Sequence, residues 1–234
     1  QTAVVYGQTY FKRAKVGLGG YLYNDVTGPT SRTGLQMAYA YHIPVKEKTY
    51  VSVGLEARLQ QLQFDRAKLL AELGSLDPVA AGASNRLKAD AGFGIFYNSP
   101  SFQVGASVSQ LVQTKYHLYD GTDTAALQGK LYRHFYLHGN YNWKIDEETL
   151  LIPNFLLIYL PNAPLESQYG VTVKNQLVWF GLNWRAKQCW MISAGVTVKE
   201  RFSIGYAFDI YSTPLNIYVK GSSGHELLLH YEFR

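Results

Sequence analysis

Five charged residues offer the clearest chemistry in the sequence, because they occupy alternating positions in two successive segments. Glu56 and Arg58 lie in the first segment, and Arg86, Lys88 and Asp90 lie in the second. Opposite charges on neighbouring strands can pair across a β-ladder. The set therefore predicts either a cluster that neutralises itself inside the fold or a charged path for an ion or ligand.

Metal-binding patterns are weak throughout the chain. His134 and His138 share one face of an expected strand, but four residues of strand span about 13 Å, too far for two ligands of one ion. The single cysteine, Cys189, excludes a disulfide framework and a cysteine-rich zinc site. The segment Asp120–Asp123 lacks the spaced ligands and closing Glu of a calcium loop. We therefore expect no metal and no cofactor.

Catalytic motifs are also lacking in the sequence. The glycines Gly17, Gly19 and Gly20 are not a nucleotide fingerprint, because no helix is expected after them and Leu22 occupies the third glycine position. No G-x-S-x-G elbow occurs, and no spacing of Ser, His and Asp singles out a nucleophile. These observations predict a protein that is not an enzyme.

The composition narrows the fold class. Of 234 residues, 47% are hydrophobic and 15% aromatic, whereas only 17% are charged, and the net charge is +5. This apolar and aromatic content excludes a disordered chain. No run of about 18 apolar residues is present, which excludes a helical membrane span. The cations are scattered singly, so nucleic-acid binding is not expected.

Alternation of apolar and polar residues recurs along nearly the whole chain. Between Tyr50 and Gln61, aliphatic residues alternate with serine, glycine, charged residues and glutamine. The expected strands are mostly about 10–12 residues long, the length that a tilted strand needs to cross a bilayer. Glycine and serine enrich the polar face, and aromatic residues stand at strand ends, as in transmembrane barrels. The pattern predicts an all-β, antiparallel up-and-down transmembrane β-barrel, and favours it over a soluble β-sandwich or lectin-like module.

Counting the alternating segments gives about thirteen strands. They are expected at 2–10, 15–24, 33–43, 49–63, 86–98, 101–112, 130–144, 148–159, 167–174, 176–185, 189–199, 201–211 and 224–234. Short turns alternate with longer loops, expected at 25–32, 64–85, 112–129, 160–166 and 212–223, with a short exception at 186–188. Because bacterial single-chain barrels have even strand numbers, we expect about fourteen strands, with the first strand preceding Gln1. Residues 1–234 form a single domain in this interpretation.

Several segments, in this order, extend over essentially the whole chain: Asn24-Asp25 with Gly28, Ala38-Tyr39-Ala40-Tyr41-His42, Ala91-Gly92-Phe93-Gly94-Ile95-Phe96-Tyr97, Val104-Gly105-Ala106-Ser107-Val108, Arg133-His134-Phe135-Tyr136-Leu137 with Gly139 and Tyr141, Ile152-Pro153-Asn154, and Gly224-His225-Glu226-Leu227-Leu228-Leu229-His230-Tyr231-Glu232-Phe233. Together they resemble the PorP/SprF family of outer-membrane proteins of the type IX secretion system. The closing segment is the most distinctive, although Arg234 follows Phe233 where a terminal aromatic residue is common.

The resemblance implies a non-enzymatic role in the outer membrane of a Gram-negative bacterium of the Bacteroidota. It implies binding or anchoring of a secreted adhesin or its C-terminal domain, a part in gliding motility, and contact with the periplasmic ring lipoprotein of the secretion machine. Membrane lipid is a further expected partner. Candidate contacts in the outer loops are Asp65, Asp77, Tyr119 and Asp120. The alternative is an outer-membrane diffusion channel or a hydrophobic-ligand transporter of the fatty-acid type.

Overall fold

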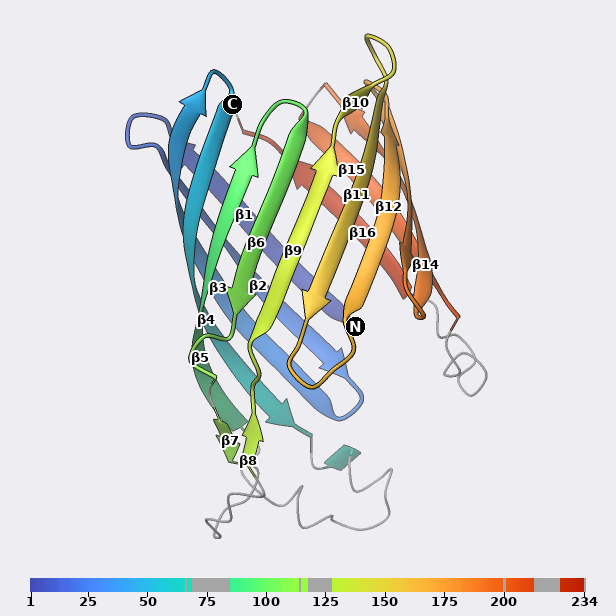
Figure 1. Cartoon of the computed structure of the whole chain (residues 1–234). Coiled ribbons are helices and arrows are strands. Elements are labelled where there is room, and N and C mark those ends of the chain that lie inside the picture. Colours follow the sequence, from blue (N-terminus) through green and yellow to red (C-terminus); the bar gives the residue numbers. More distant parts are fainter. Residues whose placement is uncertain are drawn as a thin grey trace. The chain divides into compact units, whose positions relative to one another are not determined.

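The computed structural model describes residues 1–65, 67–68, 85–113, 115–117, 128–199, 201–212 and 224–233. Its main element is a fourteen-stranded antiparallel sheet in which strands adjacent in the chain are adjacent in space (Figure 1). The strands in sheet order are β1 (Thr2–Phe11), β2 (Val16–Thr27), β3 (Thr30–Lys46), β4 (Thr49–Phe64), β5 (Asn85–Asn98), β6 (Phe102–Ser109), β9 (His134–Tyr141), β11 (Leu150–Tyr159), β12 (Glu166–Lys174), β13 (Val178–Arg185), β14 (Cys189–Val198), β15 (Phe202–Tyr211) and β16 (Gly224–Tyr231). The two-residue β10 (Trp143–Lys144) pairs with β11. The expected up-and-down all-β fold is confirmed.

The chain divides into two compact units. The first comprises residues 1–96 and 107–135, and the second comprises residues 97–106 and 136–234. The sheet order begins at β1 and ends at β16, and no ladder joins these two strands in the described part of the chain. No helix among the described residues is long and apolar enough to cross a membrane.

In the first unit, long and regular ladders join β1 to β4. The β1–β2 ladder runs without interruption from Thr2↔Asp25 to Phe11↔Val16. The β3–β4 ladder carries one irregularity, between Pro44 and Lys46. Because successive side chains point to opposite faces of a strand, these registers separate an apolar face from a polar face.

The β2–β3 connection corrects one expectation. Residues 25–32 were expected to form a longer loop, but β2 continues to Thr27 and β3 begins at Thr30, so only Gly28 and Pro29 lie between them. Gly28 has a φ of +56°, a left-handed conformation that glycine adopts without steric cost. The Gly-Pro pair therefore closes a tight hairpin that extends both strands beyond their apolar stretches.

A second correction concerns the chain around residue 130. One strand was expected over 130–144, but the part of this segment that belongs to the main sheet consists of two strands, β9 and β10. Residues 128–130 instead form β8 (Gln128–Lys130), which pairs with β7 (Lys115–His117) in a separate two-stranded sheet. The short β7 lies inside the segment expected to be a loop. Three-residue strands give too little alternation to be recognised in a sequence.

In the second unit, continuous antiparallel ladders join β11 to β16. In β13, the side chains of Val178, Phe180, Leu182 and Trp184 are all exposed and share the apolar face. Trp179, Gly181 and Asn183 alternate with them on the polar face and are more buried. This inversion of the usual soluble pattern is typical of strands whose apolar face meets lipid.

The burial of the whole described chain agrees with that interpretation. Cys189 is the buried hydrophobic residue and Ser52 the buried polar one among the described residues. Large apolar side chains are exposed on every long strand of both units, for example Val5 at 73% and Leu227 at 69%. Apolar surface of this extent is incompatible with a water-soluble monomer and fits a sheet held in a bilayer.

Candidate functional site

A network of polar side chains covers the polar face of β2, β3 and β4 in the first unit. Arg58 and Glu56, two residues apart on β4, form an ion pair with 2.9 Å between Nη2 and Oε1. Gln36 of β3 donates from Nε2 to Glu56 Oε2 at 2.6 Å and accepts from Arg58 Nε at 3.1 Å. The phenol of Tyr21 donates to the same Gln36 Oε1. Glu56 therefore accepts from two partners, and each charge faces its opposite.

A neighbouring contact extends this network along the strands. Tyr23 of β2 donates its hydroxyl to Gln60 Oε1 at 2.9 Å, crossing over β3 to reach β4. The crossing passes over Gly34 of β3, where a Cβ would overlap the Tyr23 ring. A glycine is required here because the aromatic ring occupies the space of a side chain.

The network offers polar recognition rather than bond-making chemistry. It contains a carboxylate, a guanidinium, amides and phenols, but no nucleophile next to a base. Opposite charges at this distance cancel at long range, so the cluster presents little net charge to an ion. Such a surface suits hydrogen bonding to a polar ligand or closure of a lumen by its own side chains.

The second half of the predicted charge cluster lies on β5. Lys88 is half-buried, and the side chain of Arg86 lies outside the described structure. Asp90 bends back to the main chain, where its Oδ1 accepts from the amides of Ala91 at 2.7 Å and Val112 at 3.1 Å. Its Oδ2 is buried without a partner among the described residues. The ion pair between Glu56 and Arg58 runs along one strand, and pairing between β4 and β5 stays a prediction.

A serine and a histidine lie close together on the polar face of the first unit. His42 Nδ1 is 2.7 Å from Ser52 Oγ, and the Tyr10 and Tyr50 rings meet the imidazole edge-on at 5.1 and 5.2 Å. The other imidazole nitrogen faces Gly17, where a Cβ would be 2.9 Å away. No described carboxylate is hydrogen-bonded to His42, so the third member of a catalytic triad is not supplied.

Of the predicted outer-loop contacts, the structure describes only Asp65. Its Oδ1 accepts from the amides of Ala67 and Lys68 at 3.1 and 3.2 Å, and its own amide donates to Pro29 O at 2.8 Å. The carboxylate therefore caps the chain that follows β4, and the Asp65 amide ties this point to the β2–β3 turn. The other three candidates, Asp77, Tyr119 and Asp120, lie outside the described residues.

The histidines considered as metal ligands contact other groups. His134 Nδ1 lies 2.8 Å from Gln110 Oε1 and 3.0 Å from the Tyr132 carbonyl oxygen. Within the described ranges, no group of three His, Cys, Asp or Glu residues lies close enough together to hold a metal ion.

The second unit carries a polar cluster that the sequence pattern did not single out. Gln188 donates from Nε2 to Glu166 Oε1 at 2.6 Å, and Arg185 Nη2 approaches Gln168 Oε1 at 3.5 Å. Main-chain hydrogen bonds link the same cluster, which we call the polar corner. The Gln188 amide donates to Arg185 O at 3.0 Å, and the Ser212 amide donates to Gln188 O at 2.8 Å. These residues lie at or near three different connections between strands, and the registers of the ladders bring them together.

Cys189 lies at this corner as well. It pairs with Arg185 across one ladder and with Tyr211 across the other, and it is fully buried. Alternation places the sulfur on the polar face, while the exposed Trp190 points to the apolar face.

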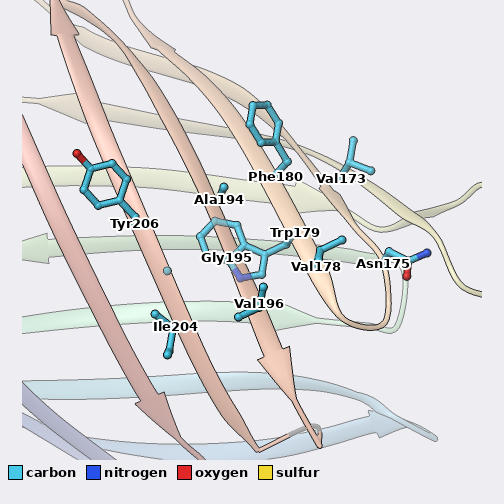
Figure 2. Close-up of a pocket in the computed structure, with 11 residues that line it drawn as sticks. Val173, Asn175, Val178, Trp179, Phe180, Ala194, Gly195, Val196, Ile204 and Tyr206 are labelled. Carbon is cyan, nitrogen blue, oxygen red and sulfur yellow. The ribbon is translucent and has the colours of Figure 1, made fainter.

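The apolar face of the second unit contains a shallow hollow of about 570 Å³ (Figure 2). Ala194 lies between two larger neighbours, Phe180 on β13 and Tyr206 on β15, so a small side chain alternates with bulky ones. The Tyr206 hydroxyl lies 2.6 Å from His225 Nδ1. The lining is mostly apolar, which suits contact with a hydrocarbon chain and provides no acid–base pair.

One carboxylate in the turn between β10 and β11 has a shifted titration. Asp146 Oδ1 accepts from the amides of Glu148 at 2.9 Å and Thr149 at 2.7 Å. These bonds stabilise the ionised form and lower the pKa of Asp146, the Glu148 amide contributing most.

Comparisons with known proteins agree with this geometry. No curated protein matches the chain significantly in sequence. The Ralstonia pickettii toluene transporter TbuX shares the fold over 94% of this chain and 78% of its own, with a TM-score of 0.51 and 12% identity. The CymD monoaromatic hydrocarbon channel covers 100% of this chain and 87% of its own, with a TM-score of 0.50 and 11% identity. The model of the type IX secretion system membrane protein PorP/SprF family matches residues 1–231, and the chain therefore belongs to that family.

Proposed function

We propose that the chain is a non-enzymatic component of type IX secretion that binds and anchors a secreted surface protein of the adhesin type in the outer membrane. The observation that carries this proposal is the family match, which extends over residues 1–231. The exposed apolar faces of both units support it, because they give the chain a stable position in lipid from which to hold a partner.

The hydrogen bonding of the side chains on the polar face also favours anchoring over catalysis. Glu56, Arg58 and Gln36 hydrogen-bond to one another, so this polar network has no reactive group directed at a substrate. Hydrogen bonds within such a network fix side chains in place. A rigid sheet with an inert polar face is suited to presenting loops to a partner protein.

The proposed contact surface is the outer loop that follows β4. Asp65 fixes the start of this loop through the Ala67 and Lys68 amides and ties it to Pro29. The carboxylate therefore holds Ala67 and Lys68 in place at the start of the loop. The partners in this proposal are the adhesin, or its C-terminal domain, on the outer side and the ring lipoprotein on the periplasmic side.

Extraction from native outer membranes in mild detergent, followed by mass spectrometry of what travels with the chain, tests the proposal. We expect a large secreted protein or a ring lipoprotein at near-stoichiometric level. Deleting residues 66–84 should release the secreted protein while the chain remains folded in the membrane. Replacing residues 161–165, in a different loop, with a Gly-Ser segment of equal length is the matched control. An unchanged adhesin level after the deletion would remove the loop from the proposal.

A diffusion channel is the second candidate, because TbuX and CymD are described as a transporter and a channel and share this fold. Planar-bilayer recordings separate the two functions. A steady single-channel current through the purified chain supports a channel, whereas a silent bilayer together with a retained secreted protein supports the anchor. If the Glu56–Arg58 network closes the lumen, the double substitution Glu56→Ala/Arg58→Ala should open a current in an otherwise silent protein.

A further inference from the structure

Two neighbouring turns of the first unit concentrate positive charge. The β1–β2 connection carries Lys12, Arg13 and Lys15, and the β3–β4 hairpin carries Lys46 and Lys48. All five side chains are exposed. Glu47 is the carboxylate among them, so cations outnumber acids five to one. We call these five residues the cationic turn pair.

The structure holds the two turns together. The His42 amide donates to Lys15 O at 2.8 Å, directly beyond the last pair of the β2–β3 ladder, Val16↔Tyr41. Lys15 and Lys48 both have left-handed backbone conformations, with φ of 56° and 58°. Glycine or asparagine adopts this conformation more readily than lysine, so each turn retains a cation where a neutral residue would cost less strain.

The level of the turns in the sheet indicates what they meet. Immediately before them, the apolar face carries exposed aromatic and aliphatic side chains: Phe11, Tyr41, Ile43 and Val45. Aromatic residues at strand ends mark the boundary between hydrocarbon and headgroups in membrane barrels. Cations in the turns that follow this boundary are therefore expected at the depth of lipid phosphates.

Positive charge is not a general property of the turns. In the second unit, the β10–β11 turn carries Asp146, Glu147 and Glu148 beside Lys144. The excess of cations in the two adjacent hairpins of the first unit is not shared by this turn, although the single cations Lys174, Lys199 and Arg201 also lie in or beside turns of the second unit.

We propose that the cationic turn pair binds the anionic phosphate headgroups of membrane phospholipids. The five cations supply the charge, and the apolar residues below them contact the acyl chains of the same lipids. Each Lys or Arg at a lipid surface strengthens binding roughly fivefold at low salt. This surface fixes the first unit at the headgroup level independently of any protein partner, so the proposal does not depend on the anchoring function.

Native mass spectrometry of the full chain in neutral detergent, titrated with phosphatidylglycerol or phosphatidylcholine, tests this site. We expect phosphatidylglycerol to bind at least tenfold more tightly than phosphatidylcholine. The quadruple substitution K12Q/R13Q/K46Q/K48Q should abolish that preference. The matched control is K174Q/K199Q, which removes exposed cations from strand ends in the second unit and should leave the preference intact.

The two hairpins provide a second test that does not require the quadruple variant to fold. K12Q/R13Q and K46Q/K48Q should each weaken phosphatidylglycerol binding by several-fold, and added salt should weaken binding in the native chain more than in either variant. Equal affinity for both lipids, or an unchanged preference in the quadruple variant, overturns the proposal. Loss of an acidic protein from the native extract with lipid preference unchanged identifies a protein dock instead, and also overturns it.

Discussion

Replacing Glu56 with alanine should destabilise the folded chain by about 3 kcal/mol. The substitution removes the acceptor of two hydrogen bonds, one from Arg58 at 2.9 Å and one from Gln36 at 2.6 Å. A hydrogen bond to a charged group contributes about 1.5–3 kcal/mol, and the lower figure applies because Arg58 and Glu56 are 23% and 22% exposed. Among the residues that the structure describes, Arg58 then retains only its bond to Gln36.

Guanidinium unfolding of the chain in lipid vesicles, followed by tryptophan fluorescence, measures this loss. Glu226→Ala, which removes an exposed carboxylate of β16, is the control and should change the free energy of unfolding by less than about 0.5 kcal/mol.

A double-mutant cycle with Arg58→Ala isolates the pair itself. Because removing Arg58 as well leaves no uncompensated charge, the coupling between Glu56 and Arg58 should reach about 1–2 kcal/mol. A loss below 1 kcal/mol in the single variant, or additive effects in the double variant, would refute the reasoning that these side chains act as one network.

Three further predictions concern the second unit. Because folding lowers the Asp146 pKa, the ionised carboxylate should stabilise the β10–β11 turn at pH values above its ordinary titration range. This contribution should be lost as the pH falls through the lowered pKa. Hydrogen exchange at the Thr149 amide should show this acid dependence in the native chain and in Glu147→Gln, but not in Asp146→Asn. Gly205→Ala should lower the stability of the folded chain by about 1–3 kcal/mol, since the added Cβ would lie 2.7 Å from the Trp179 ring. Thermal melts should show a smaller loss of stability when the same substitution is made in a Trp179→Ala background. Equal losses in both backgrounds would exclude the ring as the cause. The fully buried Cys189 should not react with a polar maleimide until the chain unfolds, whereas Lys187→Cys in the same hairpin should add one rapidly labelled thiol; labelling of the native chain would contradict its burial.

Strand positions were largely predictable from the sequence because alternation acts over ten or more residues. The expected strands at 49–63 and 189–199 match β4 and β14 to within one residue at each end. Alternation failed where the chain lacks enough of it. The sequence predicts a loop at 25–32, around Gly28 and Pro29, because Asn24, Asp25 and Arg32 interrupt the apolar series. The ladders nevertheless include all three residues.

The polar sites were less predictable, and the reason is geometric. Alternation assigns Glu56, Arg58 and Lys88 to one face, but it does not say which neighbour each side chain reaches. Arg58 is long enough to turn along its own strand, where residues two apart lie on the same face, and it meets Glu56 there while contacting Gln36 on β3.

The corner around Gln188 and Cys189 shows the same limit more strongly. Its members are Glu166, Gln168 and Arg185 together with these two residues, and no pair of them would be joined by a motif search. Two ladders, β12–β13 and β13–β14, set the register that brings them into contact. A sequence can reveal the face of each strand from its own residues, because the face depends on one chain segment. The partners on that face depend on registers between segments, and a shift of one residue in either ladder would exchange the polar corner for the apolar face. Residues that act together in such a sheet are therefore found from the ladders, and their roles are best tested by substitutions made in pairs across them.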